Sequence, residues 1–100
     1  MTLEITENNG VMVAVLDGRL DPAAVPQFSI DMQPLLENAD KHIVLDCTKM
    51  EFISSSGLRS FLTLRKHTMA QGGDVTIKGI SPEVKHVFNI TGFFSLFNFE

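Results

Sequence analysis

Three consecutive serines, Ser54, Ser55 and Ser56, stand where a short apolar segment gives way to a helical pattern that starts with Gly57 and Leu58. One hydroxyl is enough to cap a helix, so the run admits two interpretations. In the first, one serine caps the helix and the other two are solvated loop residues. In the second, the run is a phosphorylation site, because the first-turn N–H groups of a helix favour a nearby dianion. A phosphate there would change what binds to the helix start without disturbing the fold.

No other set of residues predicts catalysis or metal binding. The histidines are dispersed at His42, His67 and His86, and none has a Cys, Asp or His at ligand spacing, so we expect no metal site. Asp21 and Asp46 are better explained as a helix cap and a strand-end group than as an acid/base pair. We therefore expect no enzymatic activity and no cofactor.

Composition predicts one globular domain spanning residues 1–100, with 44% apolar and 20% charged residues. The formal net charge of −4 argues against a nucleic-acid or anionic-membrane surface, because both partners require a basic face. The single cysteine, Cys47, cannot form an intrachain disulfide. No apolar run has the length of a membrane span, and the N-terminus lacks a signal-peptide pattern, so we expect a soluble, cytoplasmic protein.

The first half of the chain predicts a hairpin followed by a helix and a strand. Leu3 and Ile5 alternate with polar residues, and Asn8 to Gly10 favour a tight turn. Residues 11–16 are continuously apolar, which predicts a central strand covered on both faces. Asp21 and Pro22 predict a helix start, and Pro34 predicts a kink or two short pieces before about Glu37. Residues 42–47 predict a short buried strand, with Phe52 and Ile53 as a bridge remnant.

The second half predicts two further helix–strand units. A helix is expected from Leu58 to about Gln71, with Leu58, Phe61, Leu62 and Met69 on its buried face. A strand over 74–78, a helix begun by Ser81 and closed by Gly92, and a last strand over 96–99 follow. This order predicts an α/β fold with a mixed sheet of four to five strands and helices mainly on one face. A small doubly wound α/β module is the rival prediction, which an all-parallel sheet would favour.

Five segments together resemble the STAS-domain anti-sigma-factor antagonists, in order and over nearly the whole chain. They are Gly18 to Asp21, His42 to Asp46, Phe52 to Leu58, Ile80 to Val84 and Asn89 to Phe94. The resemblance implies a STAS-like domain that acts by partner switching in transcription regulation and signal transduction. Such an antagonist sequesters an anti-sigma factor that is also a serine kinase, and its phosphorylation by that kinase breaks the complex. A PP2C-type phosphatase then restores binding.

The family motif Asp-Ser-Ser/Thr-Gly-Leu places the phosphorylated residue at Ser55, with Ser56 and Ser54 as fallback sites. The motif aspartate is replaced by Ser54 in this sequence. Asp21 matches an acidic position near the phosphosite. We expect the partner-binding face at the start of the helix after these serines and in the loop after the second strand, comprising Asp21, Ser54, Ser56, Gly57, Arg59 and Ser60. The alternative function is a STAS scaffold or small-ligand-sensing module that is never phosphorylated.

Overall fold

The computed structural model describes all residues, 1–100, as a five-stranded sheet with helices. The strands are β1 (Thr2–Asn8), β2 (Val11–Leu20), β3 (His42–Ile53), β4 (Asp74–Lys78) and β5 (Asn98–Phe99). The α-helices are α1 (Val25–Asp31), α2 (Gln33–Glu37), α3 (Ser55–Gln71) and α4 (Pro82–Ile90), with 3₁₀ turns η1 (Pro22–Ala24) and η2 (Phe94–Leu96). The spatial strand order is β1-β2-β3-β4-β5.

The sheet is mixed, which confirms the predicted fold class and excludes the doubly wound alternative. β1 pairs antiparallel with β2, whereas β2, β3, β4 and β5 pair in parallel. The turn between β1 and β2 holds Asn9 at φ 52° and Gly10 at φ 81°. Positive φ at both central residues is the geometry of a tight hairpin turn, and Asn-Gly adopts it readily.

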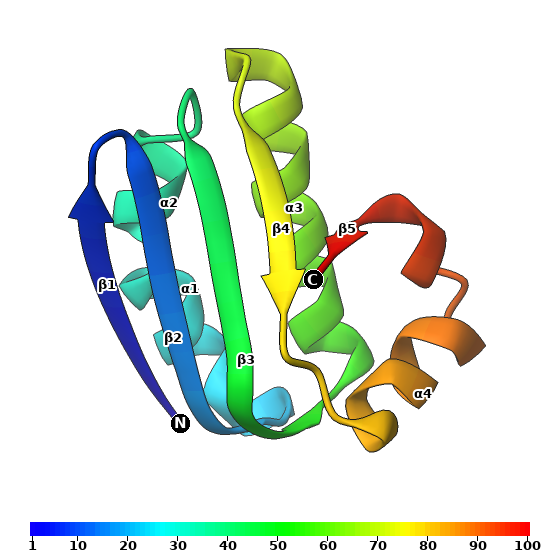
Figure 1. The fold of residues 1–100 in the computed structure, drawn as a ribbon. Coiled ribbons are helices and arrows are strands. Elements are labelled where there is room, and N and C mark those ends of the chain that lie inside the picture. Colours follow the sequence, from blue (N-terminus) through cyan, green and yellow to red (C-terminus); the bar gives the residue numbers. More distant parts are fainter.

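The helices α1, α2 and α3 all lie behind the sheet in Figure 1, and no helix covers the near face of β1 to β4. β2 accordingly alternates: Met12, Ala14 and Leu16 are buried, while the intervening valines are partly exposed. The prediction that residues 11–16 are covered on both faces is therefore wrong. A continuous apolar run indicates two covered faces only where helices pack on both sides, and here every crossover helix packs on the same side.

β3 is longer than the predicted strand. The prediction ended too early because irregularities in β3 break the alternation of buried and exposed residues. The pairing of β2 with β3 shifts between Val15 and Asp17, and again between Gly18 and Arg19. At the first shift the Asp46 carboxylate accepts hydrogen bonds from the Thr48 backbone N–H at 3.0 Å and from the Thr48 hydroxyl at 2.6 Å. Asp46 is thus inside the strand rather than at its end. The predicted bridge remnant at residues 52–53 is the continuation of β3.

The helical layer follows the predicted breaks. The segment after Asp21 forms η1, α1 and α2, and α2 starts beside Pro34, as the sequence predicted. α3 buries Leu58, Phe61 and Leu64 against the core, but Met69 is 64% exposed and Thr68 occupies the buried position instead. The Thr68 hydroxyl donates to the Arg65 carbonyl at 2.8 Å, so this polar group is buried with a partner.

A chain of phenylalanines joins the helices to the last strand. Phe61 of α3 lies 6.1 Å from Phe28 of α1 and 6.3 Å from Phe88 of α4, between ring centroids. Phe88 in turn meets Phe97 and Phe99 edge-on at 5.8 and 5.4 Å. These contacts hold the C-terminal segment, although β5 has only two residues because η2 occupies the first part of the predicted strand.

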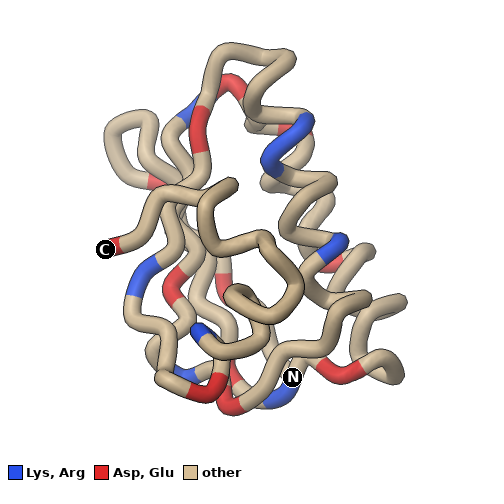
Figure 2. The backbone as a smooth tube through the Cα atoms, turned by 90° about the vertical axis from the view of Figure 1, so that its right-hand side faces the viewer, with Lys and Arg blue, Asp and Glu red and all other residues tan.

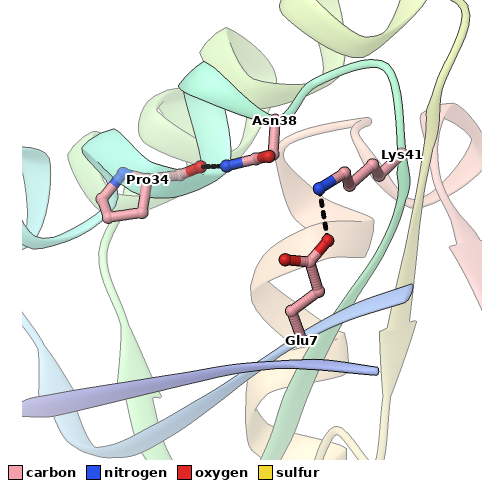
Figure 3. Close-up of polar contacts among 4 residues, drawn as sticks. All are labelled: Glu7, Pro34, Asn38 and Lys41. Atoms are coloured by element: carbon pink, nitrogen blue, oxygen red, sulfur yellow. Dashed lines mark hydrogen bonds and ion pairs between the residues drawn. The ribbon is translucent and has the colours of Figure 1, made fainter. Parts of the chain in front are cut away.

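Polar contacts close the end of the sheet where β3 begins. Lys41, which precedes β3, forms an ion pair with Glu7 of β1, and the Asn38 side-chain amide donates to the Pro34 carbonyl at 2.8 Å (Figure 3). His42 pairs with Asp74 of the neighbouring strand β4. These groups lie at the opposite end of β3 from the serine run.

Cys47 provides a test of the inner face of β3. Its thiol is fully buried, and burial raises its pKa to about 12, with the Asp46 charge adding to the shift. Because the thiolate is the reacting form, we expect no alkylation by iodoacetamide at pH 8 in the folded protein and rapid alkylation in urea. Intact-mass spectrometry over time measures this. Fast modification under native conditions would mean that β3 does not hold Cys47 inward.

Candidate functional site

The serine run forms the junction between β3 and α3, with Ser54 as the helix cap. The Ser54 hydroxyl accepts from the Gly57 N–H at 3.1 Å and donates to the Leu20 carbonyl at 3.0 Å. The Ser54 N–H donates to the same carbonyl at 2.9 Å. Ser54 therefore has two structural roles: it caps α3, and it links the helix start to the end of β2 by hydrogen bonds.

Gly57 is buried against that same strand end. A Cβ on Gly57 would lie 2.8 Å from Leu20 Cγ and 3.1 Å from the Leu20 carbonyl oxygen. The absence of a side chain thus allows α3 to approach β2 closely. We expected Gly57 on the partner-binding face; in the structure the space beside it is filled by Leu20, so Gly57 is packed inside the site rather than presented on its surface.

The other two serines differ from Ser54 in exposure and bonding. Ser55, the first residue of α3, is exposed. Ser56 is partly exposed, and its hydroxyl lies 3.0 Å from the Ser54 hydroxyl. Ser55 is consequently the serine whose hydroxyl is presented to solvent without a hydrogen bond to another part of the chain.

The remaining predicted surface residues separate into two groups. Asp21 directly follows Leu20 and is partly exposed; its carboxylate accepts from the Ala24 N–H at 3.0 Å and caps η1. Arg59 is exposed and forms no ion pair. Ser60, in contrast, is only 9% exposed, because it lies on the side of α3 that turns inward between Gly57 and Leu64. Ser60 is therefore corrected from a surface residue to a packed one.

The accessible group around Ser55 consists of Asp21, Ser54, Ser56 and Arg59, and we call it the α3-start surface. The first turn of α3 contains no acidic residue. The N-terminal amides of a helix carry partial positive charge, and those at the very start have no intrahelical acceptor. The α3-start surface can therefore accept a negative charge on Ser55 without direct repulsion from its own first turn.

The structure contains no group of three or more His, Cys, Asp or Glu side chains that could hold a metal ion. Hydrogen bonds from the Thr48 side chain and backbone lower the pKa of Asp46, and Lys78 and Lys49 act in the same direction. Figure 2 shows acidic and basic positions scattered over both layers of the backbone rather than gathered on one side.

A hollow at the far end of α3 was not foreseen from the sequence. It has a volume of about 190 Å³, and Arg65, Met69, Asp74 and Leu96 are among its lining residues. These residues come from α3, β4 and η2, so no local pattern brings them together. None of the α3-start surface residues lines this hollow.

Comparison with known proteins places this chain in one family. The family model described as STAS domain matches residues 2–100. The chain belongs to the STAS family. This confirms the resemblance carried by the five sequence segments. No helix of this STAS protein is long and apolar enough to cross a membrane.

Curated relatives of the STAS protein align over most of both chains. BtrV of Bordetella bronchiseptica is 30% identical over 97 residues, which are 97% of this chain and 84% of BtrV. The anti-sigma F factor antagonist of Paenibacillus polymyxa is 26% identical, over 96% of this chain and 83% of that protein. These relatives support the general role of an anti-sigma factor antagonist.

Solved structures share the fold at low sequence identity. An anti-sigma factor antagonist from Mycobacterium paratuberculosis superposes with a TM-score of 0.85 at 19% identity, covering 98% of this chain and 83% of that chain. The protein TM1081 from Thermotoga maritima gives 0.86 at 17% identity, covering 97% and 84%. At these identities the likeness concerns the fold alone.

Replacing each of two neighbouring serines by alanine tests their different roles. Ser54→Ala removes the cap of α3 and its bond to Leu20, so we expect a loss of about 1–2 kcal/mol in the free energy of unfolding. Ser55→Ala removes an exposed hydroxyl and should change it by less than about 0.5 kcal/mol. Urea denaturation of both variants measures the difference. Equal losses would show that Ser54 does not fasten the helix start.

Proposed function

We propose that this STAS protein is a phosphorylation-switched anti-sigma factor antagonist. Unphosphorylated, it binds an anti-sigma factor that is also a serine kinase through the α3-start surface. That kinase phosphorylates Ser55 and so weakens the complex, and a PP2C-type phosphatase removes the phosphate. The protein itself binds and is modified; it performs no catalysis.

The observation that carries the proposal is the difference in hydrogen bonding and exposure among the three serines. The Ser54 hydroxyl is committed to the Gly57 N–H and the Leu20 carbonyl, whereas Ser55 is exposed at the first helical position. A kinase requires a hydroxyl that it can reach, and modification at Ser55 leaves the cap bonds of Ser54 in place. Ser56 is the fallback site, because it is partly exposed but lies against Ser54.

The replacement of the family's motif aspartate by Ser54 changes the charge of the site and keeps its cap. Aspartate and serine are both favourable cap residues, so the local fold is preserved. The first turn of α3 then lacks the negative charge that an aspartate would supply, and the phosphate on Ser55 would bring the first one there. The switch in this chain therefore converts a neutral helix start into a dianionic one.

Known relatives support a modified state in this fold. The antagonist SpoIIAA, which matches this chain with TM-scores of 0.70 and 0.72 at 22% and 21% identity, is described in an unphosphorylated and in a phosphorylated form. The two forms match the present chain about equally well. This agrees with a phosphate that acts on the surface rather than on the fold.

The central test compares Ser55→Ala, Ser55→Asp and Ser56→Ala with the unaltered protein. We expect Ser55→Ala to bind the kinase-type partner constitutively and to incorporate no phosphate. Ser55→Asp should bind more weakly, because a charge desolvated at an interface without a counter-ion costs on the order of several kcal/mol. Calorimetry and phosphate incorporation with a cognate kinase measure both effects.

Ser56→Ala is the matched control, since it removes a neighbouring hydroxyl of the same helix turn and should leave incorporation intact. Incorporation into Ser55→Ala would move the site to Ser54 or Ser56. An unaltered protein that takes up no phosphate, from the kinase or in its host, would instead favour the non-phosphorylated scaffold or ligand-sensing module.

A second test locates the binding face. Backbone amide shifts of the labelled protein on partner binding should change most at the α3-start surface, including Asp21 and Arg59, because these groups are accessible beside Ser55. Arg59→Glu should weaken binding if the partner presents an acidic group there. Shift changes confined to α4 would place the partner elsewhere.

A further inference from the structure

The uncovered face of the sheet carries an apolar strip that the proposed function does not use. Val11, Val13 and Val15 of β2 and Val44 of β3 are partly exposed, and none of them packs against the hydrophobic core. Val13 and Val44 are register partners at the centre of this face. Because Met12, Ala14 and Leu16 of β2 face the core, the valines that alternate with them lie on the opposite face of the sheet, which no helix covers in Figure 1.

Charged groups bound this strip at its two ends along β3 and β4. At one end His42 and Asp74 are register partners, and their side chains are hydrogen-bonded. At the other end Asp46 is the register partner of Lys78. The open face therefore has a valine centre between two polar ends, one with an aspartate beside a histidine and the other with an aspartate beside a lysine.

This arrangement is complementary to itself. We propose that the uncovered face binds a second copy of this chain, the two sheets packing face to face about a two-fold axis that runs across the strands through Val13 and Val44. Rotation about that axis places each of these valines against its own counterpart. It also places Val11 of one copy against Val15 of the other, because these residues lie equally far from Val13 along β2.

The same rotation brings complementary polar groups together at the ends. Asp46 of one copy meets His42 of the second copy, and Lys78 of one copy meets Asp74 of the second. The β1 positions add no like-charge contact, since Glu4 faces Asn8, and Thr6 lies on the axis; the register places these residues beside Val15, Val11 and Val13. Packed sheets cross at about 30°, which keeps pairs this close to the axis within side-chain reach.

A rotation about the other in-plane axis, parallel to the strands, gives a poorer match. It would place Val15 against Asp46 of the second copy and Val11 against His42, burying charged groups on apolar ones. The register of the sheet thus favours one orientation of the second copy, in which its strands run antiparallel to those of the first. The helices and the α3-start surface remain on the outside of the pair.

Substitution at Val44 tests both the face and the symmetry. Val44→Asp or Val44→Lys alone would place two like charges together on the axis, so we expect each variant to sediment as a monomer at concentrations where the unaltered protein dimerises. An equimolar mixture of the two should dimerise again, because the introduced carboxylate of one chain then meets the introduced ammonium group of the other. Sedimentation velocity from about 1 µM to about 1 mM covers the range of weak, transient interfaces.

Two further comparisons keep the result interpretable. Ile90→Asp removes an apolar residue that is 68% exposed on α4 and should leave dimerisation unchanged. Lys78→Asp should weaken the dimer, and adding Asp74→Lys in the same chain should restore it, without touching the valines. A protein that stays monomeric over the whole range, or a dimer that survives Val44→Asp, would overturn the proposal, whatever the outcome for Ser55.

Discussion

The Leu20 carbonyl at the end of β2 accepts hydrogen bonds from both the backbone N–H and the hydroxyl of Ser54. The position of α3 depends on this oxygen and on the missing side chain of Gly57, which lets the helix lie against Leu20. The crossover from β3 to β4 begins at this contact. The first turn therefore sets the direction of α3 and, with it, the burial of Leu58 and Phe61. The serine run and the packing of the core therefore depend on the same contact.

In the proposed function, this shared contact is the reason that modification at the neighbouring residue would act as a switch without unfolding the protein. Ser54 and Gly57 are bonded inward, while Ser55 points to solvent from the same turn. A phosphate on Ser55 would lie beside helix amides whose partial charge favours it, so the helix start gains rather than loses stability. What changes is the charge that a docking partner meets, and this places the regulation at the interface.

Much of the fold followed from the sequence, because the turns and caps are encoded locally. Some features depend only on neighbouring residues and can therefore be predicted from the sequence. They are the turn at Asn9 and Gly10, the cap at Ser81 before α4, and the helix break at Pro34. One error arose where an irregularity interrupted the pattern of a strand. Asp46 and Thr48 bond within an irregularity of β3, which hides the second half of that strand from an alternation test.

The site shows the same division. The serine run and its cap could be predicted from residue types, whereas the burial of Ser60 depends on the turn by which α3 meets the sheet. The valine run of β2 indicated an apolar strand, but its covered faces depend on where the helices pack. No local signal states that all crossovers fall on one side.

The packing of all helices on one side of the sheet also determines where the two proposed binding surfaces lie relative to each other. The helices separate the α3 layer from the open sheet face, so a partner at Ser55 and a second copy at Val44 contact different sides of the molecule. In a pair with opposed strands, the two α3 starts lie at opposite ends, because each marks the end of its own β3. A compact partner can then reach only one of them. Association through the sheet would give a pair with two binding sites. It would not raise the affinity for the partner by avidity, because avidity requires one partner to span both sites at once.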